Sequence, residues 1–162
     1  MVQSERGLIS DLPDSLKNEI SLYLHKNLID RVPFFKDTDE DFIGEIILKL
    51  RAEIFLPGDY VFRKGDVGNC MYFIGSGLVN VLSEDESSIL ATLQDGDYFG
   101  EIALIKKIKR TRSIKTEDYC YLYSLEKNIF DALLDKNPKF KKHIYETIKI
   151  RENGSFKNHI KT

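Results

Sequence analysis

The chain has 162 residues, and its 24 Lys and Arg residues nearly balance its 26 Asp and Glu residues, so the formal net charge of −2 gives no global signature of nucleic-acid binding. Apolar residues make up 42% of the chain, enough for the core of one domain with an appendage. The sequence has no secretory signal and no apolar run of about 18 residues, so we expect the chain as given to be soluble.

The N-terminal part of the chain is predicted to be helical. Residues 1–8 show no clear pattern, and we expect them to fray. From Asp11 to Val32 apolar residues recur at helical spacing, with a proline near the first turn, which predicts a helical hairpin. A further helix is predicted from the acidic start at Asp37 to Leu50.

After residue 51 the apolar period changes to two. Seven short strand-like runs follow, separated by turn signals rich in Gly and Asp: 52–56, 60–63, 70–74, 78–82, 89–93, 111–116 and 119–124. Many short strands at this spacing are typical of a barrel or jelly roll. The predicted fold class is therefore α+β: an antiparallel β-roll, like a jelly roll or double-stranded β-helix, flanked by N- and C-terminal helices.

Helical spacing returns after Glu126. We expect Asn128 to cap a helix that ends at Asn137-Pro138. A last helix is predicted over residues 139–151, with Asn153-Gly154 as its stop signal. The residues after Gly154 are expected to be mobile.

The cysteines and histidines do not indicate an enzyme. Cys70 and Cys120 lie in apolar strand-like runs, so we expect buried free thiols rather than a disulfide, and no metal site. A metal-dependent roll enzyme needs histidines that converge inside the roll. His25, His143 and His159 all lie outside the predicted strands, and we expect them to be solvated. No Ser/His/Asp or Cys/His arrangement is present either, so the chain is predicted not to be an enzyme.

The most informative stretch is residues 98–115, where Gly, an acid and a short apolar run precede a dense basic run. Residues 99–104 have helical spacing over about one turn, and the free N–H groups at the start of such a helix form an anion site. Gly100 lets a ligand approach the backbone. The guanidinium of Arg110 can grip phosphate oxygens, and the carboxylate of Glu101, which only accepts hydrogen bonds, suits a sugar hydroxyl. The stretch predicts a ligand with one phosphate and one free sugar hydroxyl.

Each of these residues also has an ordinary structural interpretation. Glu101 could simply complement a helix dipole, and Arg110 could be one of many solvated basic residues. The combination at this spacing, inside a strand-rich chain, favours the ligand site. The basic run 106–115 lacks the interleaved aromatic residues that stack on nucleic-acid bases.

The motif Phe99-Gly100-Glu101-Ile102-Ala103-Leu104, followed by Arg110-Thr111, resembles the phosphate-binding cassette of cyclic nucleotide-binding domains. The Arg-Thr pair and the residues after it look most like the cyclic nucleotide-gated and hyperpolarisation-activated cation channels, whereas the kinase regulatory subunits usually carry Arg-Ala-Ala. The resemblance covers residues 12–151. It implies cAMP or cGMP as the ligand, leaves the choice between them open, and implies no metal or other cofactor.

The resemblance also implies a role for each site residue. Its ligand-binding positions are Phe99, Gly100, Glu101, Ile102, Ala103, Arg110, Thr111, Val81, Ala91 and Leu93. Arg110 would neutralise the cyclic phosphate, Glu101 would accept from the ribose 2′-OH, and Ile102 and Ala103 would offer backbone N–H groups. Thr111 would bond the phosphate, or a guanine amino group when the base is syn. Three of these positions would form an apolar wall against the purine, although they also suit an ordinary roll core: Val81, Ala91 and Leu93.

At the scale of the chain, the resemblance implies that residues 1–32 are the end of a C-linker, residues 33–154 the cyclic nucleotide-binding domain, and residues 155–162 a tail. The implied function is a cytosolic sensor at the cytoplasmic face of the cell membrane, part of a ligand-modulated tetrameric cation channel such as a potassium channel. Closure of the last helix over the base, with Arg151 and Glu152 as candidate contacts, would bias the pore through the C-linker.

The implied assembly is a homotetramer through the C-linker, with membrane contact only through a pore domain outside this chain and no contact with nucleic acid. One alternative stays open: a module of the same fold that binds no nucleotide and serves regulation or assembly. A nucleotide-responsive transcription factor would need a helix-turn-helix after the last helix, and only about a dozen residues follow it.

Overall fold

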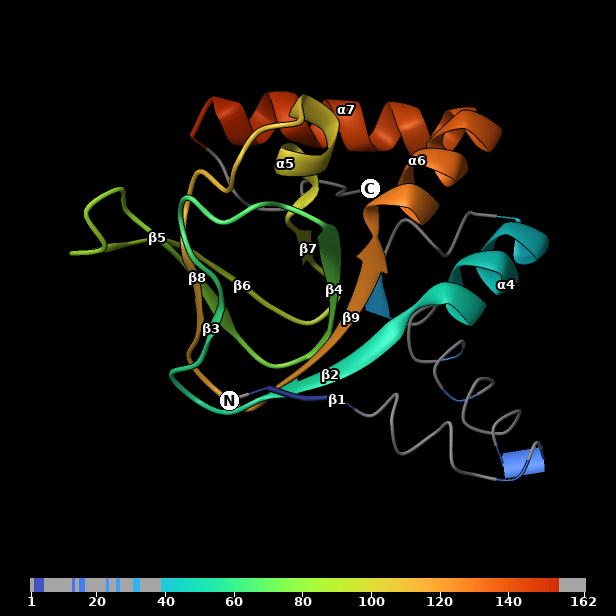
Figure 1. Ribbon diagram of the computed structural model, residues 1–162, viewed down its shortest axis with the longest axis horizontal. Coiled ribbons are helices and arrows are strands. Elements are labelled where there is room, and N and C mark those ends of the chain that lie inside the picture. The colour runs from blue at the N-terminus through green and yellow to red at the C-terminus, as the bar shows by residue number, and fades with distance from the viewer. Residues whose placement is uncertain are drawn as a thin grey trace.

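The computed structural model describes residues 2–4, 13, 15–16, 23, 26, 31–32 and 39–154. Within them, two antiparallel sheets form a roll, and helices cover one end and one side of it (Figure 1). The predicted α+β fold class is confirmed. The hairpin predicted over residues 11–32 lies largely outside the described residues, and the tail 155–162 lies wholly outside them.

The two sheets contain five and four strands, and all pairs are antiparallel. The order in the larger sheet is β1 (Val2–Ser4), β2 (Arg51–Phe55), β9 (Cys120–Glu126), β4 (Cys70–Ser76) and β7 (Tyr98–Phe99). The order in the smaller sheet is β3 (Tyr60–Phe62), β8 (Ile114–Thr116), β5 (Val79–Leu82) and β6 (Ile89–Leu93).

Two predictions about strands are wrong, and one strand was missed. Val2–Ser4 does not fray but pairs with β2 as the edge strand of the larger sheet, through backbone bonds that need no side-chain pattern. Strand β7 was not predicted, because two residues are too short to show a period. The strand predicted from Thr111 begins only at Ile114, since residues 111 and 112 form a bend.

The helices are α4 (Glu40–Lys49), α5 (Glu101–Lys106), α6 (Lys127–Lys136) and α7 (Pro138–Glu152). Helix α6 begins directly after β9, so the prediction that Asn128 caps it is wrong: Asn128 lies inside the first turn. Asn137 instead caps α7, where its side-chain oxygen accepts from the backbone N–H of Phe140 at 3.0 Å. Pro138 occupies the first turn of α7, where its missing N–H costs nothing.

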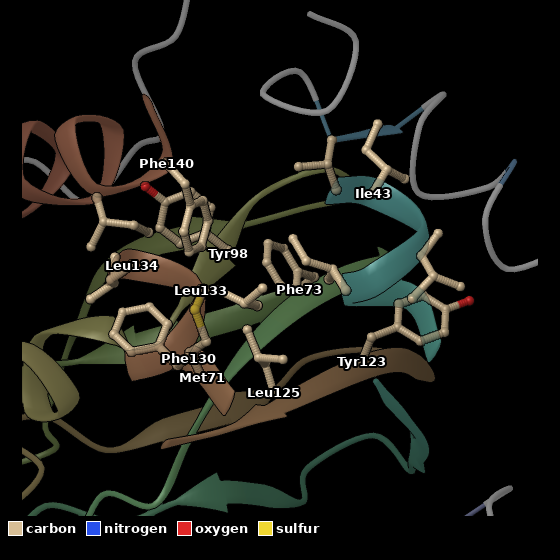
Figure 2. Packing of buried hydrophobic residues seen from close by; sticks show 14 of the residues in the cluster. Ile43, Met71, Phe73, Tyr98, Tyr123, Leu125, Phe130, Leu133, Leu134 and Phe140 are labelled. Atoms are coloured by element: carbon tan, nitrogen blue, oxygen red, sulfur yellow. The ribbon is translucent and has the colours of Figure 1, made fainter. Parts of the chain in front are cut away.

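Strand alternation divides the core into two layers. One face of β4 and β9 sends Met71, Phe73 and Leu125 toward the helices, where they meet Phe130 and Phe140 (Figure 2). The opposite face points into the roll, where a second apolar cluster joins the two sheets: Phe55, Tyr72, Ile74, Val79, Val81, Leu93, Phe99, Ile114, Cys120 and Leu122. The chain that leaves β7 passes between these layers and turns into α5, so α5 lies where roll and helices meet (Figure 1).

Candidate ligand-binding site

Gly100 turns the chain from β7 into α5 and is the N-cap of this helix. Its φ of 91° lies in the left-handed region that favours glycine. A Cβ atom here would also lie 3.1 Å from Nη1 of Arg110 and 3.3 Å from the Cα of Met71. The site therefore requires glycine both for its backbone conformation and for the close approach of the arginine.

Arg110 is held under this turn and is 5% exposed. Its Nη1 donates to the carbonyl of Gly100 at 2.7 Å, and its Nη2 donates to the carbonyl of Cys70 at 2.5 Å. The guanidinium carbon lies 4.0 Å from the ring centroid of Phe62. Burial lowers the pKa of Arg110, although a guanidinium stays charged at neutral pH. Among the described residues no carboxylate forms an ion pair with it, and its Nε is buried without a partner.

Glu101, the first residue of α5, is fully buried at 0% exposure. Its Oε1 accepts from Nη1 of Arg151 at 2.7 Å, whereas its Oε2 is buried with no hydrogen-bond partner among the described residues. Arg151 comes from the last turn of α7, is 3% exposed, and donates through Nη2 to the carbonyl of Tyr98 at 2.6 Å. No protein partner of Glu101 was predicted from the sequence, because Arg151 lies 50 residues away along the chain.

Arg110 and Glu101 open into the same cavity, whose empty volume is about 440 Å³ including its mouth. Nine of the ten predicted binding residues line it: Val81, Leu93, Phe99, Gly100, Glu101, Ile102, Ala103, Arg110 and Thr111. Ala91 does not line it; Ala91 pairs with Val81 across β5 and β6 and packs against the cluster inside the roll. Four further residues line it, of which only Arg151 was considered: Phe62, Arg112, Ile114 and Arg151. The binding roles of all these residues remain predictions.

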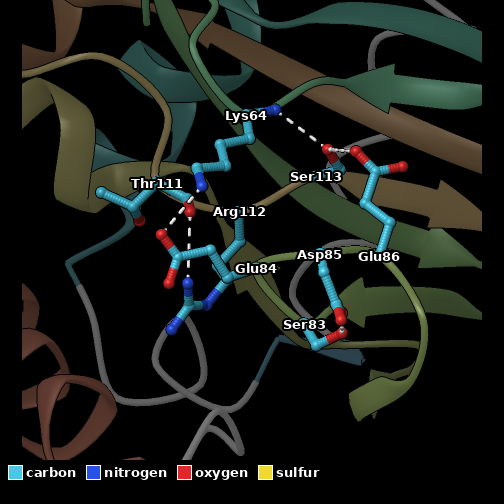
Figure 3. Close-up of polar contacts among 8 residues, drawn as sticks. All are labelled: Lys64, Ser83, Glu84, Asp85, Glu86, Thr111, Arg112 and Ser113. Atoms are coloured by element: carbon cyan, nitrogen blue, oxygen red, sulfur yellow. Dashed lines mark hydrogen bonds and ion pairs between the residues drawn. The ribbon is translucent and has the colours of Figure 1, made fainter.

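Arg112 and Lys64 lie near the exposed Thr111, and Thr111 and Arg112 line the cavity (Figure 3). Nη1 of Arg112 lies 3.4 Å from the carbonyl oxygen of Thr111, and Nζ of Lys64 lies 2.9 Å from Oε1 of Glu84 on the β5–β6 hairpin. The hydrogen bond and charge of Lys64 lower the pKa of Glu84. Arg112 belongs to the basic run 106–115 but was not among the predicted binding residues, and its place at the cavity follows from the bend before β8.

Helix α7 is tied to the site by several contacts besides Arg151. The hydroxyl of Tyr98 donates to Oγ1 of Thr147 at 2.6 Å in a buried position, and Lys106 at the end of α5 forms an ion pair with Glu152. The ring of His143 meets the ring of Tyr98 edge-on at 5.6 Å. These contacts join α7, from His143 to Glu152, to β7 and α5.

The expectation that the histidines are solvated is wrong for His143. Its imidazole is half-buried beside Tyr98, and burial, with the charge of Arg151 as a smaller cause, lowers its pKa to about 4. His25 and His159 lie outside the described residues.

The two cysteines are free thiols, Cys120 buried and Cys70 half-buried. Within the described residues, no three His, Cys, Asp or Glu side chains gather where they could hold a metal ion. The described part of the chain contains no helix with the length and apolar character to span a membrane.

Comparison with known proteins identifies the family. The family described as cyclic nucleotide-binding domain matches residues 52–137, and the chain belongs to this family. It is 38% identical over 146 residues to the potassium/sodium hyperpolarization-activated cyclic nucleotide-gated channel 1 of Rattus norvegicus, which covers 90% of this chain and 16% of the relative. It is 37% identical over 144 residues to channel 4 of the same name in Homo sapiens, covering 89% of this chain and 12% of the relative. The resemblance drawn from the sequence is confirmed.

A solved structure shows the same fold. The regulatory domain of Toxoplasma gondii PKA, crystallised with cAMP, matches with a TM-score of 0.62 and 25% sequence identity. The match covers 76% of this chain and 46% of that chain. The present chain thus corresponds to a small part of the channels and about half of the regulatory domain.

Proposed function

We propose that the chain is a cyclic nucleotide sensor whose cavity beside α5 binds cAMP or cGMP. The observation that carries the proposal is the environment of Arg110: a buried guanidinium that faces a cavity, is held by two backbone carbonyls and has no carboxylate partner among the described residues. A buried charge without a counter-ion is unfavourable, and a cyclic phosphate supplies one negative charge at this point.

The other cavity residues suit the rest of such a ligand. The N–H groups of Ile102 and Ala103 lie at the start of α5 and can donate to the phosphate. Oε2 of Glu101, buried and without a hydrogen-bond partner among the described residues, can accept from the ribose 2′-OH while Oε1 stays on Arg151. Thr111 lies at the mouth, where it can reach the phosphate or the amino group of a syn guanine.

The base would lie against an apolar surface. Val81 and Leu93 are almost fully buried and line the cavity together with Phe62. Ala91, which packs beside this surface, stays the third proposed contact, and we propose Phe62 as a further apolar contact. Arg151 lines the cavity from α7 and is the candidate base or ribose contact of that helix, whereas Glu152 pairs with Lys106.

Coupling between ligand and helix α7 would pass through Glu101, since the same carboxylate meets Arg151 and the ribose. A ligand shifts the position of α7 only if it binds the docked and undocked states with different affinity. A tenfold difference corresponds to about 1.4 kcal/mol per subunit, which becomes substantial when four subunits act together.

At the scale of the whole protein, we propose that the chain is the non-enzymatic cytosolic part of a tetrameric cation channel, at the cytoplasmic face of the membrane. Residues 1–32 would be the end of the C-linker through which a homotetramer forms, residues 33–154 the sensor domain, and residues 155–162 a tail. The names and the extent of the matched channels support this proposal. A pore domain outside this chain would make the membrane contact.

The proposed site is tested by substituting Arg110. Arg110→Gln removes the charge, and we expect cAMP and cGMP affinity to fall by at least 100-fold in isothermal titration calorimetry, while circular dichroism shows a folded chain. Arg63→Gln, at an exposed arginine that stacks on Tyr60 outside the cavity, is the matched control and should bind normally. Unchanged affinity in Arg110→Gln would reject the site.

One observation favours the second candidate function, a module that binds no nucleotide. Several polar groups of the cavity already have protein partners: Arg110 bonds two carbonyls through its terminal nitrogens, and Oε1 of Glu101 bonds Arg151. A thermal-shift measurement with both nucleotides separates the two functions, because only a binder is stabilised by its ligand.

A further inference from the structure

A second cavity lies at the end of the roll where β2, β4 and β9 meet the first turn of α6. Its empty volume is about 1040 Å³ including its mouth, and every one of its ten lining residues is polar or ionisable. The strand register explains its composition, because Arg51 and Tyr72 both lie opposite Ser124 and therefore share one face of the sheet. This face of the sheet points into the roll. Its side chains are apolar in the middle of the roll and polar at the end next to α6.

The two cavities share a wall. The ring of Tyr72, which lines the second cavity, stacks on Phe99 at 5.2 Å with an interplanar angle of 18°, and lies 6.2 Å from Phe62. Phe62 and Phe99 line the first cavity, and Phe62 supports the guanidinium of Arg110. The side chain of Cys70 lines the second cavity, while its carbonyl accepts from Arg110. An occupant of the second cavity would therefore touch Tyr72 and Cys70. Cys70 bonds Arg110 directly, and Tyr72 packs against the aromatic rings that line the first cavity.

The charges of the second cavity do not balance. Two of its three carboxylates are paired: Glu126 with Arg51 at 3.1 Å, and Asp131 with Lys127 at 2.8 Å. The third, Glu53, is half-buried and forms no ion pair with any described residue; it bonds Ser124. Burial raises the pKa of Glu53, and the hydrogen bond to Ser124 and the charge of Arg51 only partly offset this effect. The lining thus carries three carboxylates and two cationic side chains, and Glu53 is the carboxylate without an ion pair among the described residues.

The composition of the lining selects a class of ligand. An anion would be repelled by the unmatched carboxylate, and an apolar ligand would find no aliphatic side chain among the described lining residues. The hydroxyls of Ser124 and Tyr72 and the amide of Asn128 offer hydrogen bonds to a ligand with hydroxyl groups.

We propose that this second cavity binds a small organic cation with hydroxyl groups, of the amino-alcohol class, with its ammonium on Glu53, and that its occupancy alters the anion site through Tyr72 and Cys70. The binding of the cation is independent of the proposed nucleotide function; only the coupling to the anion site depends on it.

The cation site is tested on the ligand-free chain by titrating ¹⁵N-labelled protein with ethanolamine at constant ionic strength. We expect saturable shifts of the amide signals of Glu53, Cys70 and Tyr72. Ethylene glycol, which lacks the charge, should give at least tenfold weaker binding. In Glu53→Gln the ethanolamine affinity should fall at least tenfold, whereas Glu45→Gln on α4, which removes a surface carboxylate paired with Lys136, should change nothing. Non-saturable shifts, or equal binding by Glu53→Gln, would overturn the proposal.

If Glu53→Gln does not fold, Glu53→Asp provides a second variant. It keeps the negative charge but moves the carboxylate back by one methylene group, so weaker ethanolamine binding is again expected. The coupling is measured separately, as the cAMP affinity with and without saturating ethanolamine, where we expect a change of at least twofold. An unchanged cAMP affinity would overturn the coupling alone. A chain that binds ethanolamine but no nucleotide would reject the proposed function and leave the cation site intact.

Discussion

Gly100 and Gly44 differ in how strongly the structure requires glycine at their positions. Gly100 has a φ of 91° and has Arg110 and Met71 within 3.3 Å of the position that a Cβ would take. Gly44 lies inside helix α4, and a Cβ there would meet nothing within 4 Å. The first glycine is required by the site, and the second is a position where alanine would be tolerated.

We predict that Gly100→Ala lowers the free energy of unfolding by about 1–3 kcal/mol, because alanine would be forced into the left-handed region and toward Arg110. Gly44→Ala, the matched control, should raise the free energy of unfolding by up to about 1 kcal/mol through helix propensity. Urea unfolding measures both changes. Equal effects of the two substitutions would show that Gly100 is not constrained.

At the scale of elements, the notable contact is the one between α5 and α7. Arg151 and Glu101 form a buried ion pair, and Thr147 bonds the hydroxyl of Tyr98 beside it. Helix α5 supplies backbone N–H groups to the first cavity, and α7 contributes Arg151 to its lining. The ion pair therefore connects the ligand site to α7, the helix that we expect to move from the family resemblance. A buried pair is strongly destabilising when only one partner is removed.

We predict that Arg151→Leu lowers the free energy of unfolding by about 3–5 kcal/mol, because it leaves the carboxylate of Glu101 buried without its cation. The double variant Arg151→Leu/Glu101→Gln should recover much of that loss, since it removes the second charge as well. Denaturant unfolding of the two single variants and the double variant gives the coupling energy. Additive losses would mean that the pair does not act as a unit.

For the molecule as a whole, the roll, α5 and α7 meet around one cavity, so a ligand there contacts both layers of the core. At a concentration of 100 times Kd, a bound nucleotide would add about 2.7 kcal/mol to the free energy of unfolding. For a chain of this size we predict a rise in Tm of about 5–10 °C.

Differential scanning fluorimetry with cAMP and cGMP measures this shift, and adenosine, which lacks the phosphate, is the control ligand. Adenosine should give little shift, and Arg110→Gln should give little shift with any of the three. A rise in Tm with adenosine as large as that with cAMP would contradict a site organised around the phosphate.

The sequence by itself determined the fold class and most of the cavity. The strands have a clear period of two, and Gly100, Glu101 and Arg110 lie within eleven residues, so a short helix and the following loop bring them together with little help from the rest of the chain. The seven predicted strands exist, six of them with shifted ends and β6 with its predicted ends, but β1 and β7 are too short for their period to be read.

The tertiary structure alone decided which residues meet across the fold. Arg151 reaches Glu101 from 50 residues away, and the carbonyl of Cys70 meets Arg110 from 40 residues away. Neither contact can be read from a local sequence pattern. The first depends on how α7 packs, and the second depends on where β4 lies in the sheet. Ala91 was placed on the cavity by analogy of position, and Phe62 was overlooked, since a two-residue period shows that a strand has two faces but not which residues of a face reach a ligand.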